Sequence, residues 1–144
     1  MTVSGKSIRE HEAESLREPY PYHVIELGLR YHDRETLYGR INRRVDKMVE
    51  MGLTEEVKAA REQGLTATAA QAIGCKELYS WLDGKETQEE ALEKLKQSTR
   101  RYAKRQLTWF GTDQRMRWIE PDTLAAGETP LDKAMEILEK EGMA

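Results

Sequence analysis

Apolar and polar positions alternate along this chain in blocks that predict helices and a few short strands. Residues 22–29 (YHVIELGL) form a short apolar run with β-branched side chains and a glycine. This pattern is typical of a strand, and we expect the strand to be buried on both faces. Residues 33–52 carry one apolar stripe with helical spacing, made of Leu37, Ile41, Val45 and Met48. Asp33 is the expected N-cap of this helix, and Gly52 is its expected stop.

Helix and strand signals continue through the rest of the chain. Thr87 and Glu90 have the spacing of a capping box, which predicts a long helix from 88 to about 110. The other expected elements are helices at 54–64, within 65–84 and at 130–141, and a strand at 115–121. Pro19 and Pro21 should interrupt regular structure. Because no repeat or linker divides the sequence, we expect one domain over 1–144, with a C-terminal helical tail at 122–144.

Positive charge gathers on two of these helices, although the chain is acidic overall. The sequence has 23 Lys and Arg against 26 Asp and Glu, a net charge of −3. On the helix at 33–52 a basic arc adjoins the apolar stripe, and its members are Arg40, Arg43, Arg44 and Lys47. On the helix after Thr87 the apolar side holds Leu92, Leu95, Tyr102, Ala103 and Phe110, with Gln106 as a polar exception. The opposite side holds Lys94, Arg101, Lys104, Arg105 and Thr108, with Arg100 at the margin.

This second basic cluster has no acidic residue between Lys94 and Phe110, so we expect no carboxylate partner one helical turn away. Segregated positive charge produces a field that attracts anions. Aromatic and hydroxyl side chains beside it suit a phosphate backbone and its bases. The residues thus predict an anionic partner and leave RNA, DNA and small phosphates open. The competing interpretation is a structural or protein-interaction domain whose basic face pairs with acidic segments such as 86–93.

Several other classes of function are excluded. No apolar run approaches the roughly 20 residues that span a bilayer, and the N-terminus lacks the apolar core of a signal peptide. A single cysteine, Cys75, makes no internal disulfide, which favours a cytoplasmic location. His11, His23 and His32 lack the spacing of metal ligands. Residues 4–7 (SGKS) lack the first glycine and the preceding strand of a P-loop.

Three segments together resemble the bacterial tRNA dimethylallyltransferases in order and spacing. They are LYGRINRRVDKMVEMGLTEEV (37–57), AQAIGCKEL…WLDG (70–84) and TRRYAKRQLTWF (99–110). The resemblance covers roughly residues 1 to 120, and in it SGKS matches a segment just after the middle of the full-length enzyme. It implies an α/β, predominantly α-helical fold with few short strands, the C-terminal part of a P-loop NTPase-like fold.

The resemblance also implies a transfer reaction on tRNA. In this family the N6 amine of the adenosine 3′ of the anticodon displaces pyrophosphate from dimethylallyl diphosphate, and Mg²⁺ assists. The leaving pyrophosphate needs cationic groups, and the adenosine must leave its stack to react. The expected partners are therefore the tRNA anticodon stem-loop and dimethylallyl diphosphate, with no DNA and no membrane. Mg²⁺ is the expected cofactor, bound mainly through the family's N-terminal half.

Site residues follow from the matching motifs. Arg44 matches the arginine that the family directs at the diphosphate, and Arg40 resembles its supporting partner. The implied RNA-binding residues are Gln71, Ala72, Ile73, Gly74, Cys75 and Lys76 in one segment, and Arg101, Lys104, Arg105, Gln106, Thr108 and Trp109 in the other. The residues alone also fit a close-packed helix start in the first segment and core packing of Trp109 and Phe110 in the second. Cys75 and Gly111 depart from the family pattern, which commonly has an aromatic and a basic residue there.

The family's Walker loop and catalytic aspartate lie in an N-terminal half that has no counterpart in this sequence. We therefore expect the chain alone to be inactive, either as a fragment or as a truncated relative that lost catalysis. The leading hypothesis is the C-terminal half of a tRNA dimethylallyltransferase. The alternative is a non-catalytic helical RNA-binding module.

Overall fold

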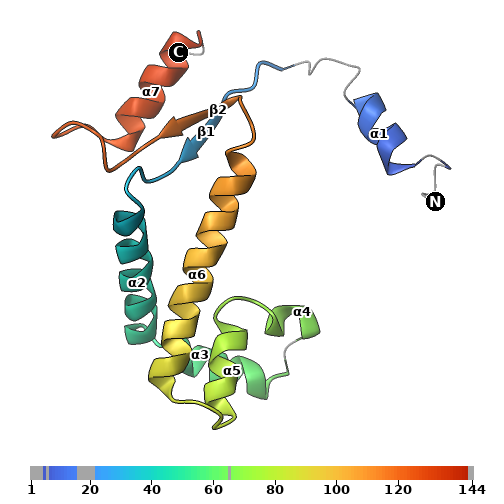
Figure 1. Ribbon diagram of the computed structural model, residues 1–144, viewed down its shortest axis with the longest axis vertical. Coiled ribbons are helices and arrows are strands. Elements are labelled where there is room, and N and C mark those ends of the chain that lie inside the picture. The colour runs from blue at the N-terminus through green and yellow to red at the C-terminus, as the bar shows by residue number, and fades with distance from the viewer. Residues whose placement is uncertain (1–4, 6, 16–21, 65, 143–144) are drawn as a thin grey trace.

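The computed structural model describes residues 5, 7–15, 22–64 and 66–142 of the chain. Its elements are α1 (Ile8–Ser15), β1 (Glu26–Leu29), α2 (Arg34–Glu50), α3 (Leu53–Glu62), α4 (Ala67–Ala70), α5 (Cys75–Leu82), α6 (Gln88–Phe110), β2 (Met116–Ile119) and α7 (Pro130–Lys140) (Figure 1). The prediction of a mainly helical α/β chain with few short strands is confirmed. Ser4, Lys6, Pro19 and Pro21 lie outside the described residues.

Local side-chain signals set the helix starts where the sequence predicts them. The carboxylate of Asp33 accepts hydrogen bonds from the backbone N–H groups of Glu35 and Thr36. Asp33 is therefore the N-cap, and α2 begins directly after it. The capping box of Thr87 and Glu90 is formed in both directions at the start of α6. These bonds satisfy backbone donors that a helix end leaves free.

In the described part of the chain the sheet has two strands, β1 and β2, paired in parallel. Gly28 lies opposite Trp118 in the register, and a Cβ at position 28 would stand 2.7 Å from the indole ring. Glycine is therefore required by the close approach of the ring. The expected burial of β1 on both faces is wrong, because Leu27 is 39% and Leu29 65% exposed. Within the described residues β1 pairs with one strand, and α7 packs against β2, so the side chains of Leu27 and Leu29 are left partly open to solvent.

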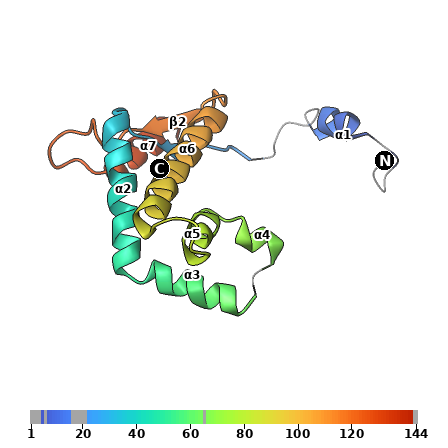
Figure 2. The same cartoon turned by 60° about the horizontal axis from the view of Figure 1, so that its bottom comes forward.

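The hydrophobic core lies at the end of the molecule where α3, α5 and α6 meet (Figures 1 and 2). Its buried centre is Val57, Leu78 and Ala91, and Leu78 is completely buried. Helix α6 continues beyond this core beside α2 and reaches the sheet (Figure 1). The long helix thus ties the core to the sheet and carries its C-terminal half along a more open part of the molecule.

Candidate anion-binding interface

Helix α2 displays an open groove of about 510 Å³ beside Tyr31. Its apolar floor is Leu37 and Ile41, and its charged lining is Arg40, Arg43, Arg44 and Lys47. No ion pair with a carboxylate involves these four cations in the described part of the chain. The guanidinium of Arg40 lies 5.4 Å from the centre of the Tyr31 ring, a cation–π contact that orients it without neutralising it. The groove is therefore suited to an anion.

The basic cluster of α6 is divided into a paired half and an open half. Lys94 is bonded to Glu86, Lys96 lies 2.6 Å from Asp46 of α2, and Arg100 lies 3.0 Å from Glu93. None of these three pairs joins residues one helical turn apart, as expected, but carboxylates that precede the cluster or lie on α2 reach these cations. Within the described ranges, by contrast, Arg101, Lys104 and Arg105 make no ion pair with a carboxylate.

Two contacts define how α2 and α6 face each other. Arg100 donates a hydrogen bond of 2.7 Å to Asn42, and Lys96 pairs with Asp46, so the helices run antiparallel. Side chains on an α-helix advance by about 100° per residue. Because the two helices run in opposite directions, the residue that follows a contact residue points toward the same side of the pair on both helices. Open cations of both helices therefore lie on one face: Arg43 and Lys47 from α2, and Arg101 and Lys104 from α6.

The turn between α4 and α5 holds the first predicted RNA-binding segment. Gly74 is buried with φ +107°, a left-handed backbone that favours glycine. The buried carboxylate of Glu77 accepts a 2.9 Å hydrogen bond from the Gly74 N–H group and holds the turn. Gln71, Ala72 and Lys76 are exposed on it, whereas Ile73 and Cys75 are half-buried. Glu77 was not among the predicted site residues, although a glutamate three residues after a helix-starting glycine is a recognisable capping signal.

The two predicted RNA-binding segments differ in position. Figures 1 and 2 show the α4–α5 turn near the core end of α6, on the side away from α2. The second segment occupies the other end of α6, next to β2 (Figure 1). The structure therefore does not join the two segments into one small pocket.

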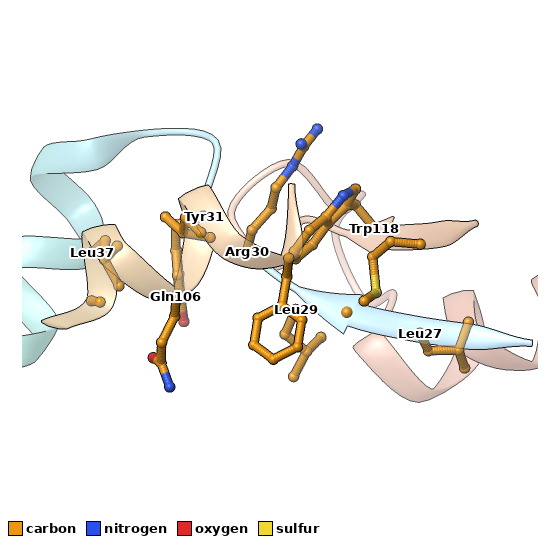
Figure 3. A pocket seen from close by; sticks show the side chains of 12 residues that line it. Leu27, Leu29, Arg30, Tyr31, Leu37, Gln106 and Trp118 are labelled. Atoms are coloured by element: carbon orange, nitrogen blue, oxygen red, sulfur yellow. The ribbon is translucent and has the colours of Figure 1, made fainter. Parts of the chain in front are cut away.

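Gln106 lies on a different side of α6 from the open cations. With Ala103, Leu107 and Phe110 it lines an apolar hollow of about 330 Å³ between α6, α2 and the sheet. Figure 3 shows Leu27, Leu29 and Trp118 around this hollow, with Arg30 placed over the Trp118 ring at 5.3 Å. Trp109 is 77% exposed and Phe110 45% exposed. Core packing of Trp109, which the sequence left open, is therefore absent among the residues that the structure describes.

Metal clusters and membrane-spanning helices are both absent from the described part of the chain. No group of three or more His, Cys, Asp or Glu side chains in the described ranges could hold a metal ion. Among the described residues, no helix combines the length and the apolar character needed to cross a bilayer.

Comparison with known proteins decides the family. A profile described as IPP transferase matches residues 1–113. The chain belongs to the IPP transferase family. The predicted resemblance is confirmed by curated relatives called tRNA dimethylallyltransferase. The enzyme of Halalkalibacterium halodurans is 45% identical over 119 residues, which are 82% of this chain and 38% of the relative. That of Bacillus subtilis is 46% identical over 119 residues, with 82% and 37% covered.

Solved structures of this family share the fold. The full-length tRNA isopentenylpyrophosphate transferase of Bacillus halodurans superposes with a TM-score of 0.73 at 42% identity, covering 93% of this chain and 43% of that one. The tRNA delta(2)-isopentenylpyrophosphate transferase of Staphylococcus epidermidis gives 0.72 at 39% identity, covering 92% and 43%. The predicted fold, the C-terminal part of a P-loop-like fold, is confirmed. The chain spans less than half the length of these relatives.

Proposed function

We propose that this chain forms the RNA-facing and diphosphate-facing part of a tRNA dimethylallyltransferase. The reaction transfers a dimethylallyl group from dimethylallyl diphosphate to N6 of the adenosine 3′ of the anticodon. The observation that carries the proposal is the set of open cations on α2 and α6, in a chain that belongs to the IPP transferase family. A cytoplasmic location, where tRNA is available, goes with it.

The groove on α2 supports the diphosphate role. As the N6–C bond forms and the C–O bond to the diphosphate breaks, negative charge grows on the leaving pyrophosphate, and cations placed there stabilise the transition state. We assign Arg44 to the diphosphate and Arg40 to its support, held by the ring of Tyr31. The proton released from N6 would go to a base in the part of the enzyme that this chain does not span.

Exposed and cationic side chains support the RNA role. We assign RNA contacts to the turn on which Gln71 and Lys76 are exposed and to the open end of α6 with Arg101, Lys104, Arg105 and Thr108. Arg43 and Lys47 extend the same positive face onto α2. Because phosphate contacts supply much of the affinity for nucleic acid, such a face suits the backbone of an RNA hairpin. Gln106 faces the apolar hollow and is the assignment least supported by the geometry.

Mg²⁺ fits the proposed reaction but not the side chains of the α2 groove. Mg²⁺ prefers oxygen ligands, whereas the charged lining of the groove is entirely Arg and Lys. If the ion is used, we expect its ligands to be the diphosphate and residues beyond this chain.

Complementation tests the proposal directly. The 144-residue chain would be mixed with a separate polypeptide comprising the N-terminal part of the Bacillus subtilis relative, and transfer of labelled dimethylallyl to tRNA would be measured. We expect transfer from the mixture and none from either part alone. Transfer by this chain alone would refute the assignment of the base and P-loop to the rest of the enzyme.

A non-catalytic RNA-binding module is the second candidate, because the open cations of α6 would bind RNA without any reaction. Salt-dependent tRNA binding without transfer in the complementation mixture would favour it. Absence of both tRNA binding and transfer would refute both candidates and favour a structural domain.

A further inference from the structure

The C-terminal half of α6 carries two adjoining stripes on its exposed side. Tyr102, Arg105 and Trp109 stand at i, i+3 and i+7 and share one stripe, since side chains at this spacing lie on one face of a helix. Arg101, Lys104 and Thr108 have the same spacing and form the neighbouring stripe. One stripe is thus aromatic with a guanidinium between its rings, and the other is cationic with a hydroxyl group.

Both aromatic side chains of the first stripe are open to solvent. Trp109 is 77% exposed and Tyr102 46% exposed. The guanidinium of Arg105 lies 5.7 Å from the centre of the Tyr102 ring, so the two side chains of this stripe make a cation–π contact. Large exposed aromatic surface beside cations marks a binding surface more often than a solvated one.

Space for a planar ligand is present beside Trp109. The indole borders an open hollow of about 550 Å³ that is also lined by Phe110, Met116 and Leu27. The carboxylates of Glu26 and Asp113 line this hollow too, and Arg115 lies 3.1 Å from the first and 2.7 Å from the second. The single guanidinium of Arg115 offsets one of these two negative charges, which reduces the repulsion of a nucleotide at this end of α6.

We propose that Tyr102 and Trp109 form a stacking platform for unpaired bases of an RNA loop, while Arg101 and Lys104 hold the adjoining phosphates. Bases expose their faces for stacking only where they are unpaired, and recognition of RNA loops commonly uses aromatic rings and guanidinium planes. With a rise of about 1.5 Å per residue, Tyr102 and Trp109 lie about 10 Å apart along the helix. Bases stacked about 3.4 Å apart would place roughly three nucleotides along this distance.

An RNA loop fits better than an apolar protein partner. A protein covering Trp109 would also remove water from Arg101, Lys104 and Arg105, and these cations make no ion pair with a carboxylate in the described part of the chain. Desolvating unpaired charges is costly. A phosphate backbone supplies the opposite charge at the same place as the bases. The inference rests on the proposed RNA binding and adds the manner of contact and the requirement for unpaired nucleotides.

The test compares Trp109→Leu, which removes the ring, with Trp109→Phe, which keeps one. Met51→Ala is the matched control, because Met51 is an apolar side chain with the same 77% exposure on another part of the surface. Each variant of the full chain is titrated with an RNA hairpin copying a tRNA anticodon arm and with a blunt duplex of its stem. We expect Trp109→Leu to weaken hairpin binding about 10-fold, since one stacked base contributes this order of affinity. Duplex binding and the salt dependence should not change, and Trp109→Phe and Met51→Ala should bind as the unaltered chain does.

Several outcomes would overturn the platform. Equal hairpin binding by Trp109→Leu and the unaltered chain would do so while leaving RNA binding intact. An equal loss for hairpin and duplex would show a general effect rather than stacking. If Trp109→Leu left RNA binding unchanged but prevented assembly with the complementing polypeptide, the stripe would be a protein interface. Failure of the unaltered chain to bind either RNA would instead refute the proposed function. Thermal melting checks the fold of each variant. Tyr102→Leu is a second test variant, which should weaken binding of the hairpin but not of the duplex.

Discussion

The division of α6 into paired and open cations predicts a difference between two variants of equal charge. Arg101→Gln with Lys104→Gln removes two cations that make no ion pair with a carboxylate in the described ranges. Lys94→Gln with Lys96→Gln removes two cations of the same helix that are held by carboxylates. Because both double variants lose two positive charges, a difference between them reports the arrangement of the charges rather than their number.

The expected magnitude follows from counterion release. Each neutralised phosphate contributes about 0.7 to the slope of log affinity against log salt on single strands and about 0.9 on a duplex. Losing two contacts should therefore lower the slope by about 1.4 to 1.8 in the variant lacking Arg101 and Lys104. Between about 50 and 200 mM salt this difference corresponds to roughly a 10-fold change in relative affinity. The Lys94 and Lys96 variant should keep a slope close to that of the unaltered chain.

Fluorescence anisotropy with a labelled anticodon arm at several salt concentrations measures both slopes. Circular dichroism confirms that each variant keeps its helices. Equal slope changes in the two double variants would refute the reasoning, because pairing with carboxylates would then not decide which cations meet phosphate. No change in either variant would place the RNA on another surface.

Three further predictions concern stability. Leu78→Ala should lower the free energy of unfolding in urea by about 2–5 kcal/mol, since Leu78 is fully buried in the core. Gly28→Ala should cost about 1–3 kcal/mol in the same assay, because the added Cβ would meet the Trp118 ring at 2.7 Å. Hydrogen bonds and charge from two lysines of α7, with Lys133 first, lower the pKa of Glu136 from its usual 4.5 to about 2. Because the pKa of Glu136 is lower in the folded chain, its ionised carboxylate stabilises the fold above pH 4.5. This stabilisation should be lost as the pH falls from about 4.5 to about 2. Urea midpoints across this pH range measure the loss.

Each of these predictions has its own control. Leu131→Ala removes a leucine that is 69% exposed and should change stability by less than about 0.5 kcal/mol. An equal effect of the two leucine variants would contradict the placement of the core. Met116→Ala should recover part of the loss in Gly28→Ala, because the Met116 sulfur is also within 2.9 Å of the added Cβ. Glu136→Gln should reduce the acid-dependent change, and an unaltered pH profile would assign that change to other carboxylates.

Much of the local structure follows from residues close together in the sequence. Asp33, the pair Thr87 and Glu90, and Gly52 act on backbone groups within one helical turn, so the ends of α2 and the start of α6 are predictable. The basic arc on α2 is predictable for the same reason, since helical periodicity alone places it. The family motifs are likewise contiguous segments. These segments alone indicate the correct family and fold.

Charge pairing and exposure depend instead on which distant segments meet. Arg100 contacts Asn42, which is 58 residues away, and Lys96 pairs with Asp46. The absence of acidic residues from the segment that holds Lys96 and Arg100 therefore did not leave these cations without partners. Leu29 belongs to an apolar run typical of a buried strand, yet within the described ranges β1 pairs with one strand, β2, from far along the chain. Helical and strand periodicity are set by backbone geometry within a few residues. The partner of a side chain, and the water left around it, are set by packing between elements that no short-range pattern encodes.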